Sequence, residues 1–419
     1  MSTFNVFEKD RREIDGPVNV MRLEGQIDGN AKVVYLFMDH HNPPDQQTEC
    51  LNVYAQDVNK YFAQTFRELN GSSSIYDFFV ETDAWTTRID PAKRALAIKE
   101  AGGSTYRDIY LGRVRALLLS AIEYDPVTKR TLPSKIFQNV RLHYLDVREE
   151  LEKIADPIRW MREEIWNIMC SRRADFDGII DAAQYAKRTI EDIIKVYEDV
   201  TSNPVAPKTN AKTDTDTDEG PLFPLFAHSA RKLKYAYNHK SVQKIMSKLF
   251  SDQFKQFQQL PKDIDTLIQN YTRMQDSLDN PPFNPEHGWS RYFIQEADLY
   301  LKIMHDAYIQ AIELEDKASI IAAWITDCYL LRRVLDKDYI TNAIIYCGAA
   351  HAVNYAQVLV SAFGFKISHL TYSTVTSIPK LNAEIVTRVK KGQPIDDLIS
   401  PSMSAPQCSD ITDFPKNFS

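Results

Sequence analysis

The stretch IIYCGAAHAVNYAQVL at residues 344–359 decides the fold, because two kinds of apolar pattern meet in it at a single glycine. Its first part is β-branched and aromatic, which is typical of a buried strand, and its second part has helical spacing. Gly348 lies at the change, and His351 follows three residues later. We therefore expect a strand, a tight turn that Gly348 permits, and a helix with His351 near its start.

Two parts of the chain show the order of strand, helix and strand. Residues 32–41 (KVVYLFMDHH) form the first expected strand; helical spacing follows from Asp45, which is placed to cap the helix, and a second strand covers residues 75–84. Downstream, the strand that ends at Gly348 leads through a helix to a strand at 365–372. A further strand is expected at 139–148. Such crossovers join parallel strands, so the sequence predicts an α/β fold with a mostly parallel sheet flanked by helices.

A long span of helical periodicity separates these two parts, and segments such as PIRWMREEIWNIM and SVQKIMSKLFSDQFKQF are typical of it. The expected organisation is an N-terminal half of the α/β core at 1–150, a large helical insertion at 151–320, and the C-terminal half of the core at 321–375. Residues 376–419 are expected to form a short helix and a flexible tail. Residues 201–221 are almost devoid of apolar side chains, which predicts a flexible loop because burial cannot offset the entropy of ordering it.

Composition excludes several classes of function. The chain has 419 residues, 44% of them hydrophobic, which is enough to form a large buried core. Its net charge is -7 and it has no basic face, so nucleic acid is an unexpected ligand. Its five cysteines are never spaced as CxxC, which argues against a disulfide framework and favours a reducing compartment. The charged N-terminus is no secretory signal, and polar residues interrupt the apolar window at 343–365. A cytoplasmic, soluble protein without a membrane span is expected.

Polar side chains end three of the expected strands. His40 and His41 end the first, Glu81 and Asp83 end the second, and His351 follows the strand that closes on Gly348. Functional groups gather at the carboxyl ends of parallel strands, so these side chains are expected to share one edge of the sheet. Imidazoles and a carboxylate there either hold a divalent metal ion, with His40 or His41, Glu81 and His351 as ligands, or activate a water molecule directly.

Each of these residues also has a purely structural interpretation. His351 can be a core or helix-capping histidine, and Glu81 can cap a helix through the favourable N-terminal dipole. His40 and His41 can be polar residues that merely end a strand. Nearby, Arg332 and Arg333 can be solvated residues of a helix instead of a site for an anionic group.

YLFMDHH, YDFFVETDA and the downstream run LLRRVLDKDYITNAIIYCGAAHAVNYAQVL together resemble the TraB/TIKI family, which is related in fold to ChaN and the erythromycin esterases, and more closely its divergent members in large DNA viruses. That family has a strand ending in GxxH, a strand ending in Glu, and a second GxxH after an arginine-bearing helix. Gly348 with His351 matches the second GxxH, and Glu81 matches the glutamate. Arg332 or Arg333 stands where the arginine is expected. The first GxxH lacks its glycine, which leaves both His40 and His41 as candidates.

The resemblance implies a hydrolase with a peptide or ester substrate, in which an arginine stabilises the oxyanion and a divalent metal ion assists or is dispensable. The alternative is a catalytically inactive α/β scaffold or binding protein, for example a component of a virion or an assembly. In that case the helical insertion would bind a protein partner or a second copy of the chain. The expected location is the cytoplasm, in a viral setting the host cytoplasm or the virion.

Overall fold

The computed structural model describes residues 8–83, 109–125, 130–147, 151–171, 177–203, 223–279 and 288–418. The chain forms two compact units. The first comprises Met1–Asp146, Tyr237–Ile245 and Leu330–Ser419, and the second comprises Val147–Ala236 and Met246–Tyr329.

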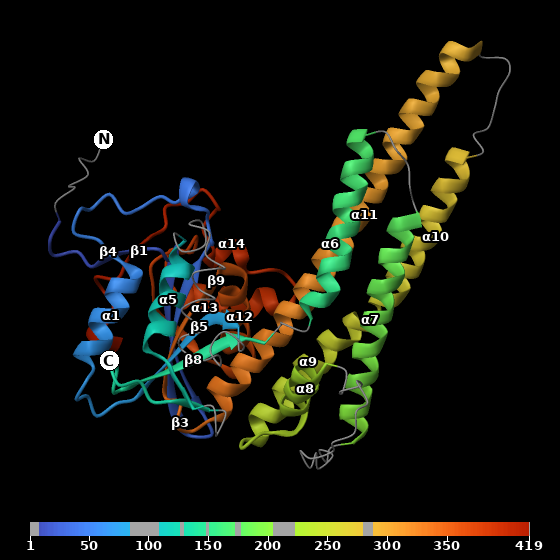
Figure 1. Ribbon diagram of the computed structural model, residues 1–419. Coiled ribbons are helices and arrows are strands. Elements are labelled where there is room, and N and C mark those ends of the chain that lie inside the picture. The colour runs from blue at the N-terminus through green and yellow to red at the C-terminus, as the bar shows by residue number, and fades with distance from the viewer. Residues whose placement is uncertain are drawn as a thin grey trace. The chain divides into compact units, whose positions relative to one another are not determined.

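A six-stranded sheet forms the centre of the first unit (Figure 1). Its strand order is β10 (Lys366–Leu370), β2 (Asn19–Ile27), β3 (Asn30–Asp39), β9 (Asn342–Gly348), β5 (Tyr76–Asp83) and β8 (Val140–Asp146). Strands β3, β9, β5 and β8 pair in parallel, whereas β2 pairs antiparallel with both of its neighbours. The α/β class is confirmed, and the sheet is mixed. A short ladder of β6 (Glu123–Asp125) and β7 (Arg130–Leu132) lies apart from it.

Strand β2 was missing from the sequence-based prediction. It forms a hairpin with β3 through Asp28 and Gly29, which have φ angles of 47° and 88°. An Asp-Gly pair favours such a turn because both central residues need a positive φ. The hairpin places β2 between β3 and β10, so the helical crossover from β9 to β10 passes over two strands.

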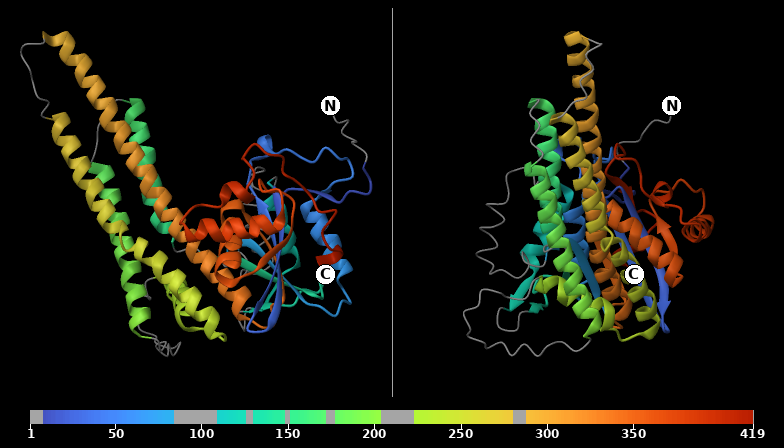
Figure 2. Two further views of the ribbon diagram at one scale, coloured as in Figure 1. Left: turned by 180° about the vertical axis from the view of Figure 1, so that it is seen from behind. Right: turned by 90° about the vertical axis from the view of Figure 1, so that its right-hand side faces the viewer.

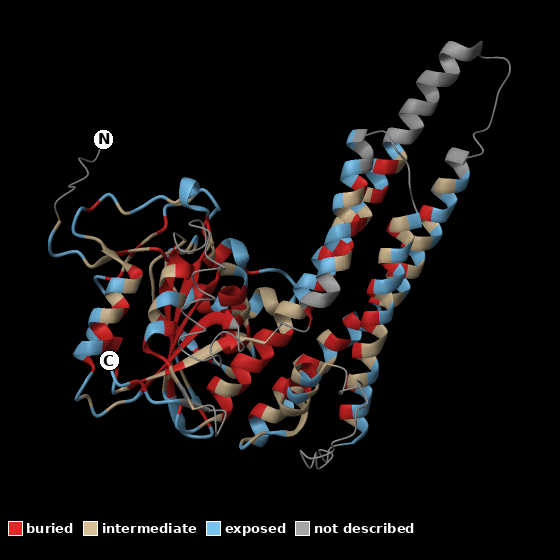
Figure 3. Cartoon of the chain, viewed as in Figure 1, coloured by how far each residue is buried: buried red, intermediate tan, exposed pale blue. Residues whose placement is uncertain are grey.

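Helices cover both faces of the sheet. On one face, α1 (Val58–Glu68) and α5 (Tyr110–Ala121) bury an aromatic cluster in which Phe62 and Phe66 pack against Phe78. On the other face, α12 (Ala349–Phe363) packs on β2, β3 and β9, and α13 (Ile378–Lys390) packs on α12 and β10. Figure 3 shows the buried residues concentrated in the strands and on the inner faces of these helices. The arrangement leaves the carboxyl ends of β3, β9 and β5 together at one edge.

The helix expected from Asp45 begins later. Residues Pro44–Gln46 form a single 3-10 turn (η1), a loop and the short strand β4 (Gln56–Asp57) follow, and α1 starts at Val58 with Asp57 as its cap. Leu51 and Tyr54, which fit the helical spacing, are exposed in the loop. The apparent periodicity over residues 45–57 was therefore misleading, because those apolar residues have no core to face.

The C-terminal segment is not a flexible tail. After α13 come α14 (Asp396–Ile399), β11 (Cys408–Asp410) and a final 3-10 turn η3 (Lys416–Phe418), and β11 pairs with β1 (Glu13–Asp15). Strand β4 lies on the other side of β1. Phe418 is buried against Tyr35 with ring centroids 5.0 Å apart. The prediction failed because proline and serine in this segment masked apolar residues that enter the core of the first unit.

The cysteine spacing argued against a disulfide framework, but the structure contains one disulfide. Cys50, in the loop before α1, and Cys408, in β11, form a disulfide across a sequence separation of 358 residues. No spacing rule reveals such a pair, because it depends on β11 lying beside β1. Cys328 and Cys347 are free and buried, and Cys170 is free and exposed.

The second unit is helical. Its helices are α6 (Glu152–Ser171), α7 (Asp177–Ser202), α8 (Pro224–Tyr235), α9 (Lys240–Phe257), α10 (Leu260–Asp279) and α11 (Gly288–Asp336); α9 begins and α11 ends within the first unit. Figure 2 shows α6 beside α11 and α7 beside α10. The loop expected at 201–221 lies outside the described residues beyond 203. In the described part of the chain, we find no helix with the length and apolar character that crossing a membrane requires.

Candidate functional site

Three of the expected residues come together at the carboxyl edge of the sheet. Glu81 lies near the end of β5, His351 lies in the first turn of α12, and His41 follows the end of β3 by two residues. The Nε2 atom of His41 lies 3.4 Å from Glu81 Oε2, and the Nε2 atom of His351 lies 3.8 Å from Glu81 Oε1. The carboxylate of Glu81 is therefore held between two imidazole rings, which we name the His-Glu-His cluster.

The main chain completes the surroundings of Glu81. The backbone N–H of Gly348 donates a hydrogen bond of 2.8 Å to Glu81 Oε2, and Arg115 of α5 donates to the main-chain oxygen of Glu81. Glu81 and His351 are both 6% exposed, whereas the His41 side chain is 34% exposed. Solvent therefore reaches the cluster from the side of His41.

Asp39 contacts both the ring and the backbone of His41, and it was not among the expected site residues. Its carboxylate is fully buried, accepts hydrogen bonds from the hydroxyl of Tyr346 at 2.9 Å and the amide of Gln407 at 3.0 Å, and lies 3.6 Å from His41 Nδ1. The sequence shows Asp39 directly before the two histidines, and its position at the strand end was the available signal. Gln407 could not be found from sequence, because it arrives from the C-terminal segment.

The backbone of His41 is strained. Its φ of 55° lies in the left-handed region, which residues other than glycine adopt at a cost of order 1–3 kcal/mol. The backbone N–H of His41 donates to Asp39 Oδ1 at 2.9 Å, and this local hydrogen bond stabilises the turn. The turn directs the His41 ring back over the strand end toward Glu81.

Gly348 is needed for a reason other than the expected one. It caps α12 with a φ of -58°, which any residue adopts, so no special turn is required. A Cβ atom at this position would instead lie 2.7 Å from His41 Nε2 and 3.4 Å from Glu81 Oε2. The glycine leaves room for the histidine ring.

Burial and charge fix the protonation of the cluster. Burial alone raises the pKa of Glu81, but the hydrogen bond from His41 and the nearby rings of His351 and His41 outweigh it, so the pKa lies well below its ordinary value. Burial lowers the pKa of His41, but hydrogen bonds and charges from Asp39 and Glu81 reverse the effect and raise it to about 9. At neutral pH, Glu81 is a carboxylate and His41 carries a proton.

The other expected residues point elsewhere. His40 Nε2 lies 3.2 Å from the carbonyl of Pro401, and burial lowers the pKa of His40. The guanidinium of Arg332 lies over the ring of Tyr237. Of the two neighbours, His41 is therefore the histidine that faces Glu81.

Arg333 belongs to a second polar group on the same face of the sheet. It donates to His143 Nδ1 at 2.9 Å and lies over the ring of Phe79, while His143 Nε2 lies 2.8 Å from Asp77. Because Arg333 donates to Nδ1, the proton of His143 sits on Nε2 and is shared with Asp77. Arg141 pairs with the same carboxylate at 2.6 Å. The contacts of this group account for both nitrogens of His143, so it stabilises the sheet.

The His-Glu-His cluster has the donor set of a catalytic metal site. Two imidazoles and one carboxylate suit zinc and other divalent transition metals, and Asp39 beside Nδ1 of His41 is the outer carboxylate that commonly orients a metal-binding histidine. Among the described residues, however, only Glu13 and the two disulfide cysteines bring three ligand atoms within 4.8 Å of one another. The donor atoms of the His-Glu-His cluster do not meet this limit, so a divalent ion there would require His41 or His351 to move.

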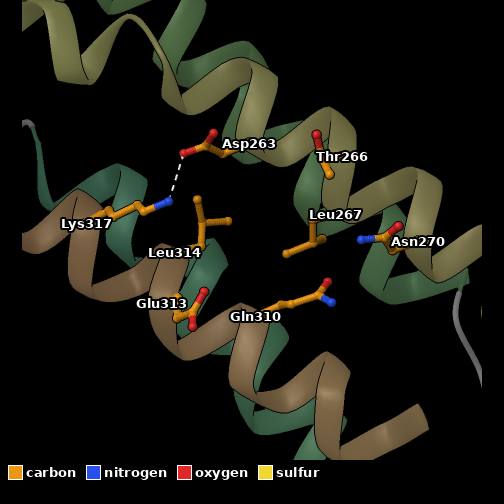
Figure 4. Close-up of a pocket in the computed structure, with 8 residues that line it drawn as sticks. All are labelled: Asp263, Thr266, Leu267, Asn270, Gln310, Glu313, Leu314 and Lys317. Carbon is orange, nitrogen blue, oxygen red and sulfur yellow. Dashed lines mark hydrogen bonds and ion pairs between the residues drawn. The ribbon is translucent and has the colours of Figure 1, made fainter.

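Two hollows lie within the helical unit. One, of about 310 Å³, lies between α10 and α11, where Lys317 and Asp263 form an ion pair of 3.1 Å at its edge (Figure 4). The other, of about 390 Å³, is lined by Trp166 and Asn167 of α6 and Tyr308 of α11, among others. Neither contains a residue expected from the sequence to act in catalysis.

Comparison with known proteins places the chain in a family. Its residues 12–419 match the model described as "Family of unknown function (DUF5847)". It is 34% identical to "Uncharacterized protein R706" of Acanthamoeba polyphaga mimivirus over the whole of both chains, and 32% identical to "Uncharacterized protein R161" of the same virus over 98% of this chain and 99% of that one. No solved structure matches. The chain therefore belongs to the Family of unknown function (DUF5847).

Proposed function

We propose that the first unit is a hydrolase of peptides or esters whose catalytic residues are His41, Glu81 and His351. One observation carries this proposal: the buried carboxylate of Glu81 lies between two imidazole rings at the carboxyl ends of parallel strands. Ligand and catalytic sites of open α/β sheets form at this edge. The resemblance of the strand-end motifs to the TraB/TIKI family supports the same proposal.

The protonation states assign roles to the residues. Glu81 is a carboxylate and accepts a hydrogen bond from an attacking water, which orients that water toward a carbonyl carbon. His41, protonated at neutral pH, donates to the oxygen on which negative charge develops, or protonates the leaving group. For this step His351, on the other side of Glu81, must be unprotonated to receive the proton of the water, and the protonated His41 then keeps Glu81 ionised. The partly exposed ring of His41 is the first of these groups that a substrate meets.

A divalent ion at the same residues would lower the pKa of a bound water and so supply hydroxide at neutral pH. Its ligands would be His41, Glu81 and His351, with Asp39 orienting His41. Binding would require His41 to give up its proton, because a metal ligand must be unprotonated. Addition of zinc near pH 7 should therefore release close to one proton per bound ion, whereas direct catalysis by the residues alone requires no such release.

The test of function is a screen for hydrolysis followed by substitution. Purified protein is incubated with p-nitrophenyl esters and a fluorogenic peptide library, with and without added divalent ions, and any turnover is measured again in His351→Ala. The exposed His305 provides the matched control, since His305→Ala removes the same ring outside the cluster. The proposal predicts that activity is lost in His351→Ala and kept in His305→Ala. Equal loss or equal retention in both contradicts it.

A binding scaffold is the second candidate, and the hollow beside Trp166 favours it. Trp166 is 52% exposed and lies against Tyr308 with ring centroids 5.7 Å apart, an arrangement that offers a large apolar contact to a partner. A chain that binds a partner through the helical unit, shows no turnover, and loses binding in Trp166→Ala would support the scaffold and leave the cluster without a catalytic role.

A further inference from the structure

The disulfide and the His-Glu-His cluster are linked by a short chain of contacts within the first unit. Gln407 directly precedes Cys408, is fully buried, and donates from Nε2 to Asp39 Oδ1 at 3.0 Å. Asp39 in turn accepts the backbone N–H of His41 and lies beside its ring. The disulfide is thus one residue and two contacts away from His41.

The contacts fix the orientation of Gln407. Its side-chain nitrogen faces two acceptors, Asp39 Oδ1 and the carbonyl of Gly16 at 3.3 Å, so the amide must present its N–H groups to both. Its backbone N–H donates to the carbonyl of Thr48 at 2.9 Å, two residues before Cys50. The loop that carries Cys50 and the segment that carries Gln407 are therefore joined by one hydrogen bond and one covalent bond.

We propose that Gln407 is a positioning residue for His41, acting through Asp39, and that the Cys50–Cys408 disulfide makes this positioning sensitive to redox conditions. Reduction by a low-molecular-weight thiol in excess converts the disulfide into two thiols and the reagent into its own disulfide, so two electrons and two protons are transferred. Both cysteines are partly exposed, which gives a thiolate access to the bond. After reduction, the loop at Cys50 is held to the Gln407 segment by the Thr48 hydrogen bond.

The coupling is reciprocal. If the disulfide holds Gln407 on Asp39, then the Gln407–Asp39 hydrogen bond must favour the disulfide by the same factor. Removing the amide in Gln407→Met should make the disulfide easier to reduce, and reducing the disulfide should loosen the hydrogen bond between His41 and Asp39. The consequence for catalysis rests on the proposed function, whereas the coupling itself requires no turnover.

Two measurements on the full chain test the inference, in a Cys170→Ser background that removes the exposed free thiol. Equilibration with glutathione buffers, followed by alkylation and mass spectrometry, gives the reduction equilibrium of Cys50–Cys408. Hydrogen exchange of the His41 amide, in oxidised and reduced protein, reports on its hydrogen bond to Asp39. Ser404→Ala is the matched control, because Ser404 lies in the same segment, is exposed, and its hydroxyl forms a hydrogen bond with the hydroxyl of Ser402.

We expect Gln407→Met to shift the reduction equilibrium about fivefold toward the thiols, which is about 20 mV for a two-electron couple, and Ser404→Ala to leave it unchanged. Reduction should speed exchange of the His41 amide by a similar factor in the parent and little in Gln407→Met. Protection of the β3 amides from exchange shows whether each variant is folded. If Gln407→Met loses this protection, Gln407→Asn, which withdraws the amide by one methylene, takes its place.

Identical His41 exchange in the oxidised and reduced parent would overturn the inference, as would a redox equilibrium in Gln407→Met equal to that of Ser404→Ala. Absence of the disulfide in the purified protein would overturn it as well. Coupling without hydrolysis would leave the inference standing and remove the proposed function. Hydrolysis without coupling would do the reverse.

Discussion

Gly348→Ala is the perturbation that most sharply tests how the cluster is built. The new Cβ atom would lie 2.7 Å from His41 Nε2, whereas ordinary contact begins near 3.4 Å, so the ring must withdraw by about 0.7 Å. His41 already lies 3.4 Å from Glu81, and the withdrawal removes their interaction. The backbone accepts alanine without strain because φ is -58°.

The expected loss of stability is small. Alanine is a poorer helix cap than glycine, which costs a few tenths to about 1 kcal/mol of stability. Moving the His41 ring away from the new Cβ atom costs about 1 kcal/mol more, a small amount because the partly exposed ring can turn outward. The total of about 1–2 kcal/mol should appear as a modest fall in the melting transition of the first unit by calorimetry. Any hydrolytic activity should fall about a hundredfold, because a displacement of this size disrupts catalytic geometry.

Gly178→Ala serves as the control. Gly178 lies in a helix of the second unit, and a Cβ atom there would meet Trp160 at an ordinary contact distance of 3.6 Å. It should be neutral or stabilising by up to about 1 kcal/mol. A crystal structure of Gly348→Ala in which His41 keeps its contact with Glu81, or a variant with full activity, would refute the reasoning that glycine is required by the close approach of the histidine.

Three further predictions concern the supports of the first unit. His143→Gln should remove a loss of stability at acid pH. Burial, with the nearby charge of Arg333, outweighs the opposing effect of Asp77 and lowers the pKa of His143 from 6.5 to about 4. The folded state is therefore fully stabilised above pH 6.5 and loses about 3 kcal/mol as the pH falls to 4, which urea titrations across this range would detect. Cys408→Ser should lower the free energy of unfolding by about 2–5 kcal/mol, because the disulfide closes a loop of 358 residues in the unfolded chain. Calorimetry should show the same loss for the reduced wild-type protein, and equal stability with and without the disulfide would count against a structural role. Lys32→Met should cost about 1–3 kcal/mol, because the buried ammonium of Lys32 donates to the carbonyls of Lys337 and Ile340 and the variant leaves both unsatisfied; an unchanged melting temperature would show that water replaces it.

Much of the first unit's fold was predictable from the sequence, because buried parallel strands carry continuous apolar runs that end in polar residues. This is how β3, β5 and β9 were located. Strand β2 was not predicted although the Asp28-Gly29 pair marks its hairpin, because its sequence has no helical crossover beside it and pairs antiparallel with both neighbours. The order of the strands depends on pairing between distant segments, which no local pattern encodes.

The residues of the site also include some that the sequence predicts and some that it does not. Glu81 and His351 were identified by their position at strand ends, and the choice between His40 and His41 needed the positive φ that turns one ring inward and the other toward Pro401. Gln407 was beyond prediction, because it reaches the cluster only through the pairing of β11 with β1. Neither of the expected arginines could be placed from helical spacing alone, since spacing gives a face of a helix and not a partner.

The central claim is that the carboxylate of Glu81 performs chemistry between His41 and His351, and Glu81→Gln tests it most directly. The substitution keeps the shape of the side chain and removes its charge. With a substrate identified by the screen, the turnover of Glu81→Gln should fall about 10²–10⁴-fold at a protein concentration and temperature at which the variant remains folded. Turnover within twofold of wild type in a folded variant would contradict the account.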